Sequence, residues 1–154
     1  MKLSEIMTRE VVVIQPDDSL QSAAKKMRDR NIGFLPVCDG EELLGVLSDR
    51  DITMRALADV MDINVMLGRD LMTTPAIYAF EDQNVSEAAK IMGENQIRRL
   101  VIVSRDDKHV VSVISMGDLA RNGITDLSGE VLQRVSEPEV TEPTENNNPP
   151  AGSK

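Results

Sequence analysis

Residues 45–51 read GVLSDRD and residues 112–118 read SVISMGD, and these two stretches decide the fold. In each, a run of aliphatic residues ends in a serine that stands three positions before an aspartate. A shift of 67 positions superimposes the two stretches and aligns three pairs: Val46 with Val113, Ser48 with Ser115, and Asp51 with Asp118. Repetition at a fixed spacing predicts that the chain contains two copies of one supersecondary unit.

The repetition continues upstream with a shift of 65 positions, which aligns Met7-Thr8 with Met72-Thr73, Ala23-Ala24-Lys25 with Ala88-Ala89-Lys90, and Ile32 with Ile97. The two additional residues of the second copy fall in residues 104–108, SRDDK. This polar stretch is typical of a turn, where insertions are best tolerated. A gap confined to a turn supports a true duplication.

Each copy begins with a predicted strand and a predicted helix. Residues 11–14, VVVI, are β-branched and favour a buried strand. Residues 16–19, PDDS, then supply a turn and a helix N-cap. The helix that follows has apolar residues at positions i, i+3, i+4 and i+7, which predicts the buried face Leu20, Ala23, Ala24 and Met27, and in the second copy Val85, Ala88, Ala89 and Met92.

A hairpin and a second helix complete each copy. Hairpin strands are predicted at residues 35–38 and 43–47, and again at residues 100–103 and 110–114. Polar residues 48–51 and 115–118 then open the second helix of each copy. The predicted fold class is therefore α+β, with two tandem βαββα repeats.

The predicted boundaries are residues 1–64 for the first repeat, 65–129 for the second, and 130–154 for a C-terminal tail. The tail has five glutamates against Arg134 and Lys154. It has too few apolar residues to offset the entropy of ordering, so we expect an acidic, disordered tail.

Composition excludes several classes of function. A formal charge of -9 and only 2% aromatic residues argue against a nucleic-acid partner, which needs basic side chains and stacking rings. No apolar run has the length of a signal sequence or a membrane span, so we expect a cytoplasmic protein without membrane contact.

Cys38 is the only cysteine and His109 the only histidine. Cys38 is expected to pack as a small hydrophobe, and His109 lacks a partner at catalytic spacing. We therefore expect no metal site and no enzyme.

The Ser-x-x-Asp pairs have two interpretations. A carboxylate placed where a strand gives way to a helix can accept both ribose hydroxyls, while the serine and free N–H groups face a phosphate. Asp51 with Ser48, and Asp118 with Ser115, have this spacing. Alternatively, each serine only caps the helix and each aspartate favours its N-terminus. The two roles are compatible, and both stay open here.

The whole pattern resembles a pair of cystathionine β-synthase (CBS) domains, and the small bacterial stand-alone CBS-pair proteins in particular. The resemblance rests on the Met-Thr segments, on the Leu-Pro-Val and Leu-Val-Ile strands and on the two Ser-x-x-Asp motifs, and it covers about residues 3–125. It implies that the repeats pack through their sheets with pseudo-twofold symmetry. It also implies two clefts for AMP, ADP, ATP or S-adenosylmethionine, and a homodimer.

The resemblance further implies that each cleft combines residues of both repeats. One cleft would contain Asp118 and Ser115 with Val113, Met7, Thr8, Val12 and Ile32. The other would contain Asp51 and Ser48 with Val46, Met72, Thr73, Ile77 and Ile97. For the aliphatic members, the alternative is an ordinary place in the core.

Basic residues distinguish the two clefts. Arg98-Arg99 stands where nucleotide-binding relatives have a basic pair for phosphates, whereas the first repeat has Gly33-Phe34. Guanidinium groups bind phosphate oxygens in a bidentate manner, so we expect the Asp118 cleft to be the nucleotide site. Solvated surface arginines are the alternative.

These residues predict a regulatory module that binds an adenosine nucleotide, requires no cofactor and acts on an unknown partner protein. The alternative is a dimerisation and interaction scaffold that binds no ligand.

Overall fold

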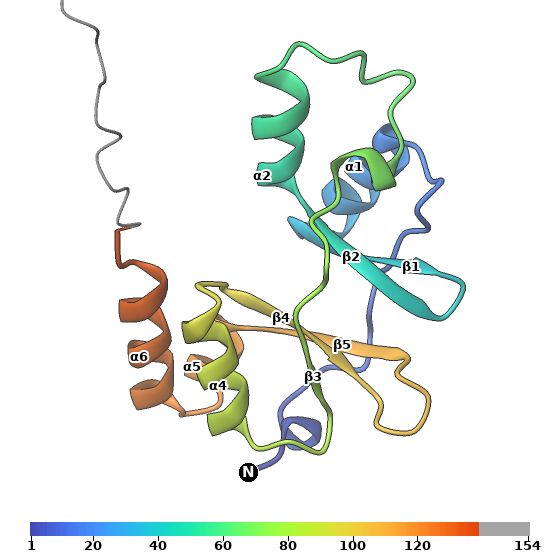
Figure 1. The fold of residues 1–154 in the computed structure, drawn as a ribbon. Helices are drawn as coiled ribbons and strands as arrows, with labels where there is room; N and C mark the ends of the chain where they lie inside the picture. The colour runs from blue at the N-terminus through green and yellow to red at the C-terminus, as the bar shows by residue number, and fades with distance from the viewer. Residues whose placement is uncertain (139–154) are drawn as a thin grey trace, which may run out of the picture.

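The computed structural model describes residues 1–138 and contains two small sheets, each flanked by helices (Figure 1). The first repeat contains β1 (Phe34–Asp39) and β2 (Glu42–Ser48), and the second contains β3 (Tyr78–Phe80), β4 (Arg99–Val103) and β5 (Val110–Ser115). The helical segments are η1 (Leu3–Glu5), α1 (Leu20–Arg30), α2 (Asp49–Asp51), η2 (Ile52–Leu57), α3 (Gly68–Leu71), α4 (Val85–Glu94), α5 (Met116–Arg121) and α6 (Thr125–Val135). None of the helices in this described part is long and apolar enough to cross a membrane.

The order of elements confirms the predicted α+β fold with two repeats. β1 pairs with β2 and β4 pairs with β5, both antiparallel, as the two predicted hairpins require. β3 lies parallel to β4. Helix α1 begins after Ser19, whose Oγ accepts a hydrogen bond from the Ser22 N–H at 3.0 Å, and this confirms the predicted N-cap.

The prediction of a strand at residues 11–14 is wrong for residues 11–13 and holds only for Ile14. Only Ile14 pairs with β1, in a parallel bridge to Val37. The Ile14 N–H donates to the Pro36 carbonyl and the Cys38 N–H donates to the Ile14 carbonyl, at 3.0 and 2.8 Å. Pro36 has no N–H to donate to the preceding residues, so the ladder stops there. In the second repeat, Val101 stands at the equivalent position and pairs with Tyr78.

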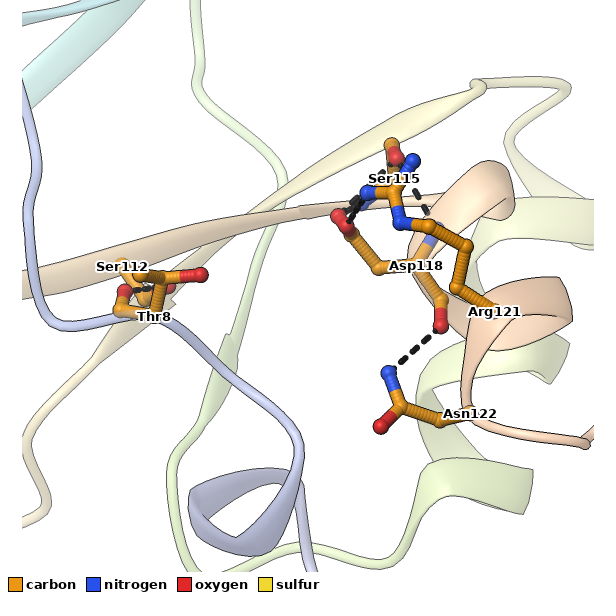
Figure 2. Close-up of polar contacts among 6 residues, drawn as sticks. All are labelled: Thr8, Ser112, Ser115, Asp118, Arg121 and Asn122. Atoms are coloured by element: carbon orange, nitrogen blue, oxygen red, sulfur yellow. Dashed lines mark hydrogen bonds and ion pairs between the residues drawn. The ribbon is translucent and has the colours of Figure 1, made fainter.

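The Met-Thr segment of each repeat lies on the sheet of the other repeat. Thr73 forms an antiparallel bridge with Val46 at the edge of β2. Thr8 lies beside β5, where the buried Ser112 hydroxyl donates to its carbonyl oxygen at 2.6 Å (Figure 2). Leu3, at the start of the chain, is fully buried in the core of the second repeat. This exchange joins the two repeats through their sheets.

Helix α6 corrects the expected start of the tail. It continues to Val135, and Val131 on it is only 1% exposed because it packs into the core of the second repeat. Residues 130–135 are therefore helical rather than disordered. The apolar spacing of Leu127, Val131 and Val135 gives this helix a buried face, which outweighs its charged residues. The rest of the expected tail, residues 139–154, lies outside the described residues.

Helix α1 has a narrower buried face than expected. Leu20, Ala23 and Met27 are buried, but Ala24 is exposed. Its equivalent on α4, Ala89, is buried beside α6. The expectation for Ala24 was wrong because only α4 has a further helix packed on that side.

Candidate functional site

Ser115 and Asp118 form a closed hydrogen-bonded box where β5 passes into α5 (Figure 2). The Asp118 Oδ2 atom accepts from the Ser115 N–H at 2.6 Å and from its hydroxyl at 2.9 Å. The Ser115 Oγ accepts from the Asp118 N–H at 3.2 Å. The other carboxylate oxygen, Oδ1, pairs with Arg121. The capping interpretation of this motif is therefore confirmed, and a ligand that approaches Oδ1 meets Arg121 there.

The first repeat repeats this arrangement around Asp51. Its Oδ2 accepts from the Ser48 N–H at 2.9 Å, and the Ser48 Oγ accepts from the Asp51 N–H at 3.0 Å. Arg55 lies 3.7 Å from Oδ1 and also donates to the Leu71 carbonyl at 2.8 Å. The Arg55 guanidinium is therefore bound to the backbone as well as paired with the carboxylate.

Arg98 and Arg99 stand at the edge of the Asp118 box. Arg99 faces Ser115 across the β4–β5 ladder, and the Arg98 carbonyl accepts from the Met116 N–H at 3.0 Å. Both side chains are exposed. The backbone of Arg98 and Arg99 thus lies beside the start of α5, where Arg121 pairs with Asp118. Guanidinium groups are good donors to anions, so a basic side chain at this place is suited to bind one.

The equivalent place in the first repeat has a glycine and a carboxylate instead of two arginines. Gly33 accepts from the Asp49 N–H at 2.9 Å through its carbonyl, as Arg98 does from Met116. A Cβ atom at Gly33 would lie 2.5 Å from the Asp49 carboxylate, so this carboxylate fills the space beside the glycine. An anion near Asp51 would therefore meet a second carboxylate.

The structure places the other expected lining residues in several surroundings. Thr8, beside Ser112, and Val113 belong to the β5 edge that leads to Ser115. Val46 and Thr73 form the equivalent edge that leads to Ser48. The remaining members divide between the cores: Met7, Ile77 and Ile97 pack against the second core, and Val12 and Met72 against the first. Ile32 is 37% exposed. Their membership of a ligand cleft stays a prediction.

Sequence reasoning missed Arg121, Arg55 and Asp49. A signal for the two arginines was present, because residues three or four positions after a helical aspartate lie on the same face of the helix. Arg121 follows Asp118 at i+3 and Arg55 follows Asp51 at i+4. The role of Asp49 had no such signal, since it depends on the approach of Gly33 from another element.

A separate hollow of about 740 Å³ lies between the β1–β2 and β4–β5 turns, away from both boxes. His109 lines it and contacts Glu41 of the first repeat, while its Nδ1 lies 2.8 Å from the Asp107 carboxylate. The sequence predicted no acidic partner at catalytic spacing for His109, whereas the structure places Asp107 and, from the other repeat, Glu41 beside it. A hydrogen bond from Ser104 and the backbone N–H of His109 hold the pKa of Asp107 below its usual value.

Cys38 is buried, as expected, and burial raises the pKa of its thiol. Within residues 1–138, no group of three or more His, Cys, Asp or Glu side chains is arranged to hold a metal ion.

Known proteins with similar sequences share this organisation. The family model described as "CBS domain" matches the chain twice, at residues 3–58 and 68–124. The CBS domain-containing protein YhcV of Bacillus subtilis is 33% identical over 135 residues, which are 87% of this chain and 94% of YhcV. Hypoxic response protein 1 of Mycobacterium tuberculosis is 32% identical over 119 residues, 77% of this chain and 82% of that protein.

A solved structure shows the same fold. The CBS domain pair of protein MJ0100, in complex with 5-methylthioadenosine and S-adenosyl-L-methionine, superimposes with a TM-score of 0.71 and 27% identity. The match covers 82% of this chain and 98% of that one. The family model covers both halves of the duplication, and the chain belongs to the CBS domain family as a CBS-pair regulatory module.

Proposed function

We propose that this CBS pair is a sensor that binds an adenosine nucleotide beside the Asp118 box. AMP, ADP and ATP fit the proposal best, since each has an anionic phosphate end, and S-adenosylmethionine is the related candidate without phosphate. The bound ligand would touch both repeats and shift their packing, which a partner protein would then read.

The observation that carries the proposal is the charge difference between the two boxes. Arg98 and Arg99 lie in the strand beside the start of α5 and Arg121 pairs with Asp118 there, whereas in the first repeat the Asp49 carboxylate lies beside Gly33. A phosphate next to three guanidinium groups gains charge-assisted hydrogen bonds. The same phosphate next to Asp49 would be repelled.

The adenosine part of the proposal draws on the relative and on the carboxylate. Protein MJ0100 was crystallised with two adenosine derivatives. The side chain of Asp118 is 25% exposed, and its Oδ1 atom pairs with Arg121, whose side chain is 73% exposed. Ribose hydroxyls would replace Arg121 at this oxygen and release the guanidinium toward the phosphates.

Isothermal titration of AMP, ATP and S-adenosylmethionine into the protein tests the proposal. The decisive variant is Arg98→Gln/Arg99→Gln, because both side chains are exposed and their loss leaves the fold intact. We expect the affinity for ATP to fall by about tenfold or more. The matched control is Arg28→Gln/Arg30→Gln at the end of α1, which removes two exposed guanidinium groups from the first repeat and should leave the affinity unchanged.

Absence of binding by all three ligands would refute the nucleotide proposal. If both double variants lose the same affinity for ATP, the loss would come from the lower net charge of the protein. Arg98 and Arg99 would then have no specific role in binding.

An exposed apolar segment favours a second function, that of a dimerisation scaffold. Six large hydrophobic residues in η2 and in the segment from η2 to α3 are 45–89% exposed: Met54, Leu57, Val60, Met61, Ile63 and Val65. A cluster of this kind is typical of an interaction site. Under this second proposal the segment joins two copies of the chain into a homodimer.

Sedimentation of the protein with and without Leu57→Asp separates the two functions. A dimer that Leu57→Asp converts to a monomer, together with no response to any nucleotide, would support the scaffold alone.

A further inference from the structure

The end of helix α6 is fixed beside the segment that contains Arg98 and Arg99. The Gln96 side-chain amide donates to the carbonyl oxygens of Arg134 and Glu137, at 3.1 and 3.4 Å. The Arg134 side chain also lies against Gly93, where an added Cβ atom would be only 2.6 Å from its Cδ. The described chain therefore ends next to the turn between α4 and β4, two residues before Arg98.

The two arginines at this turn have no acidic partner in the described part of the chain. None of the ion pairs within residues 1–138 includes Arg98 or Arg99. Both are exposed, and Arg121 and Arg134 add positive charge at neighbouring helix ends. This basic surface, formed by Arg98 and Arg99, would attract carboxylates as well as phosphates.

The chain that leaves this anchor is acidic. Glu139, Glu142 and Glu145 follow within eight residues of Glu137, and the next basic residue is Lys154. An extended chain covers at most about 3.6 Å per residue, so Glu139 reaches roughly 7 Å from the anchor and Glu142 roughly 18 Å. Arg98 and Arg99 stand only two and three residues from Gln96. The length of the segment is sufficient for its carboxylates to meet both guanidinium groups.

We propose that residues 139–145 dock on the basic surface of Arg98 and Arg99 within the same molecule. The glutamates would occupy the place that the proposed function gives to the nucleotide phosphates. Binding of a nucleotide would then displace the segment, and the freed segment would become available to a partner. This last consequence rests on the proposed function, whereas the docking itself does not.

The docking is tested without nucleotide by NMR of the full-length protein. The variant Glu139→Gln/Glu142→Gln/Glu145→Gln should shift the Nε–Hε signals of Arg98 and Arg99 and the amide signals of the neighbouring residues. The matched control, Asp17→Asn/Asp59→Asn/Asp106→Asn, removes three exposed carboxylates elsewhere and should leave these signals in place. Unchanged Arg98 and Arg99 signals in the glutamine variant overturn the proposal.

Two further measurements show whether the contact forms within one molecule and whether it competes with ATP. A signal shift that grows with protein concentration would assign the contact to a second molecule and would also overturn the docking within one chain. Titration with ATP then measures the competition, and we expect the glutamine variant to bind roughly fivefold more tightly at low salt, with little difference in 0.5 M NaCl. Shifted arginine signals without any ATP binding would uphold the docking and refute the proposed function.

Discussion

The two repeats have matching backbones at their Ser-x-x-Asp boxes and different side chains around them. The carbonyl groups of Gly33 and Arg98 accept equivalent hydrogen bonds, at 2.9 and 3.0 Å, from the first residue of the helix that follows. Around this common backbone, the first repeat places Asp49 and the second places arginines. The comparison teaches that the duplicated backbone supplies the box, while a few substitutions decide its charge.

The outer surfaces of the repeats differ in the same manner. On α4, Ala89 and Gly93 are buried and α6 packs beside them. On α1, the equivalent Ala24 and Arg28 are exposed. Small residues permit the close approach of a second helix, and the long side chain of Arg28 hinders it. Only the second repeat therefore has a C-terminal helix.

The largest effect that we expect tests this difference at α6. Val131 is 1% exposed and Leu132 is 47% exposed, although they are neighbours on the same helix. Val131→Asp should lower the free energy of unfolding by about 3 kcal/mol or more, because it buries an unpaired carboxylate. Leu132→Asp is the matched control and should change it by less than about 0.5 kcal/mol. Urea unfolding measures both variants, and equal effects would show that α6 does not pack on the second repeat.

Much of this fold was predictable because its signals are local. The hairpins and the cap at Ser19 follow from neighbouring residues, and the duplication follows from the comparison of these local patterns at an offset of 65–67 residues. The stop of the first strand at Ile14 depends on Pro36, which belongs to a different strand. Pro36 is visible in the sequence, but its effect on the first strand can be predicted only when the pairing of Ile14 with β1 is known.

The site was predictable in its motif and less so in its surroundings. Ser115 and Asp118 were found by spacing alone. The contact of His109 with Glu41 joins two turns from different repeats, so no pattern within either repeat indicates it. The hydrogen bond from Gln96 to the Arg134 carbonyl of α6 joins residues 38 positions apart, and no local pattern indicates it either. Contacts between distant segments depend on tertiary packing, which spacing does not encode.

The inner edges of the two sheets provide a second, smaller effect. Gly45 and Ser112 occupy equivalent positions on β2 and β5. A Cβ atom at Gly45 would lie 2.6 Å from the Thr73 carbonyl, which is held by the Val46 N–H at 3.0 Å. Gly45→Ala should therefore lower the free energy of unfolding by about 2–3 kcal/mol.

Ser112→Ala should cost less, about 1–2 kcal/mol, because it removes one buried hydrogen bond to Thr8 without a clash. Chemical denaturation compares the two variants under one condition. A harmless Gly45→Ala would mean that the Met-Thr segment does not lie on β2 as closely as the bridge to Thr73 requires.

The smallest effect concerns two equivalent turn aspartates, Asp82 and Asp17. Arg105 binds the Asp82 carboxylate through two hydrogen bonds, at 2.8 and 3.2 Å, and lies 3.8 Å above the Phe80 ring. Asp17 is exposed and takes part in none of the ion pairs of the described residues. The hydrogen bond from Arg105, followed by its charge, lowers the pKa of Asp82 despite partial desolvation.

A carboxyl pKa that is lower in the folded protein stabilises it above the unfolded value of about 3.9, and this contribution disappears as the pH falls through the folded pKa. Arg105→Gln should therefore lower the free energy of unfolding slightly at pH 7, since the pair is exposed to solvent. The difference from wild type should begin to shrink as the pH falls below about 3.9 and should be smallest below the folded pKa of Asp82, where the contact of Arg105 with Phe80 remains. Asp17→Asn, which removes an exposed carboxylate outside the ion pairs of the described residues, is the matched control. Urea unfolding at pH 7 and pH 3 measures the free energy of unfolding of both proteins. If wild type and Arg105→Gln differ by the same amount at both pH values, the Asp82–Arg105 pair does not stabilise the second repeat.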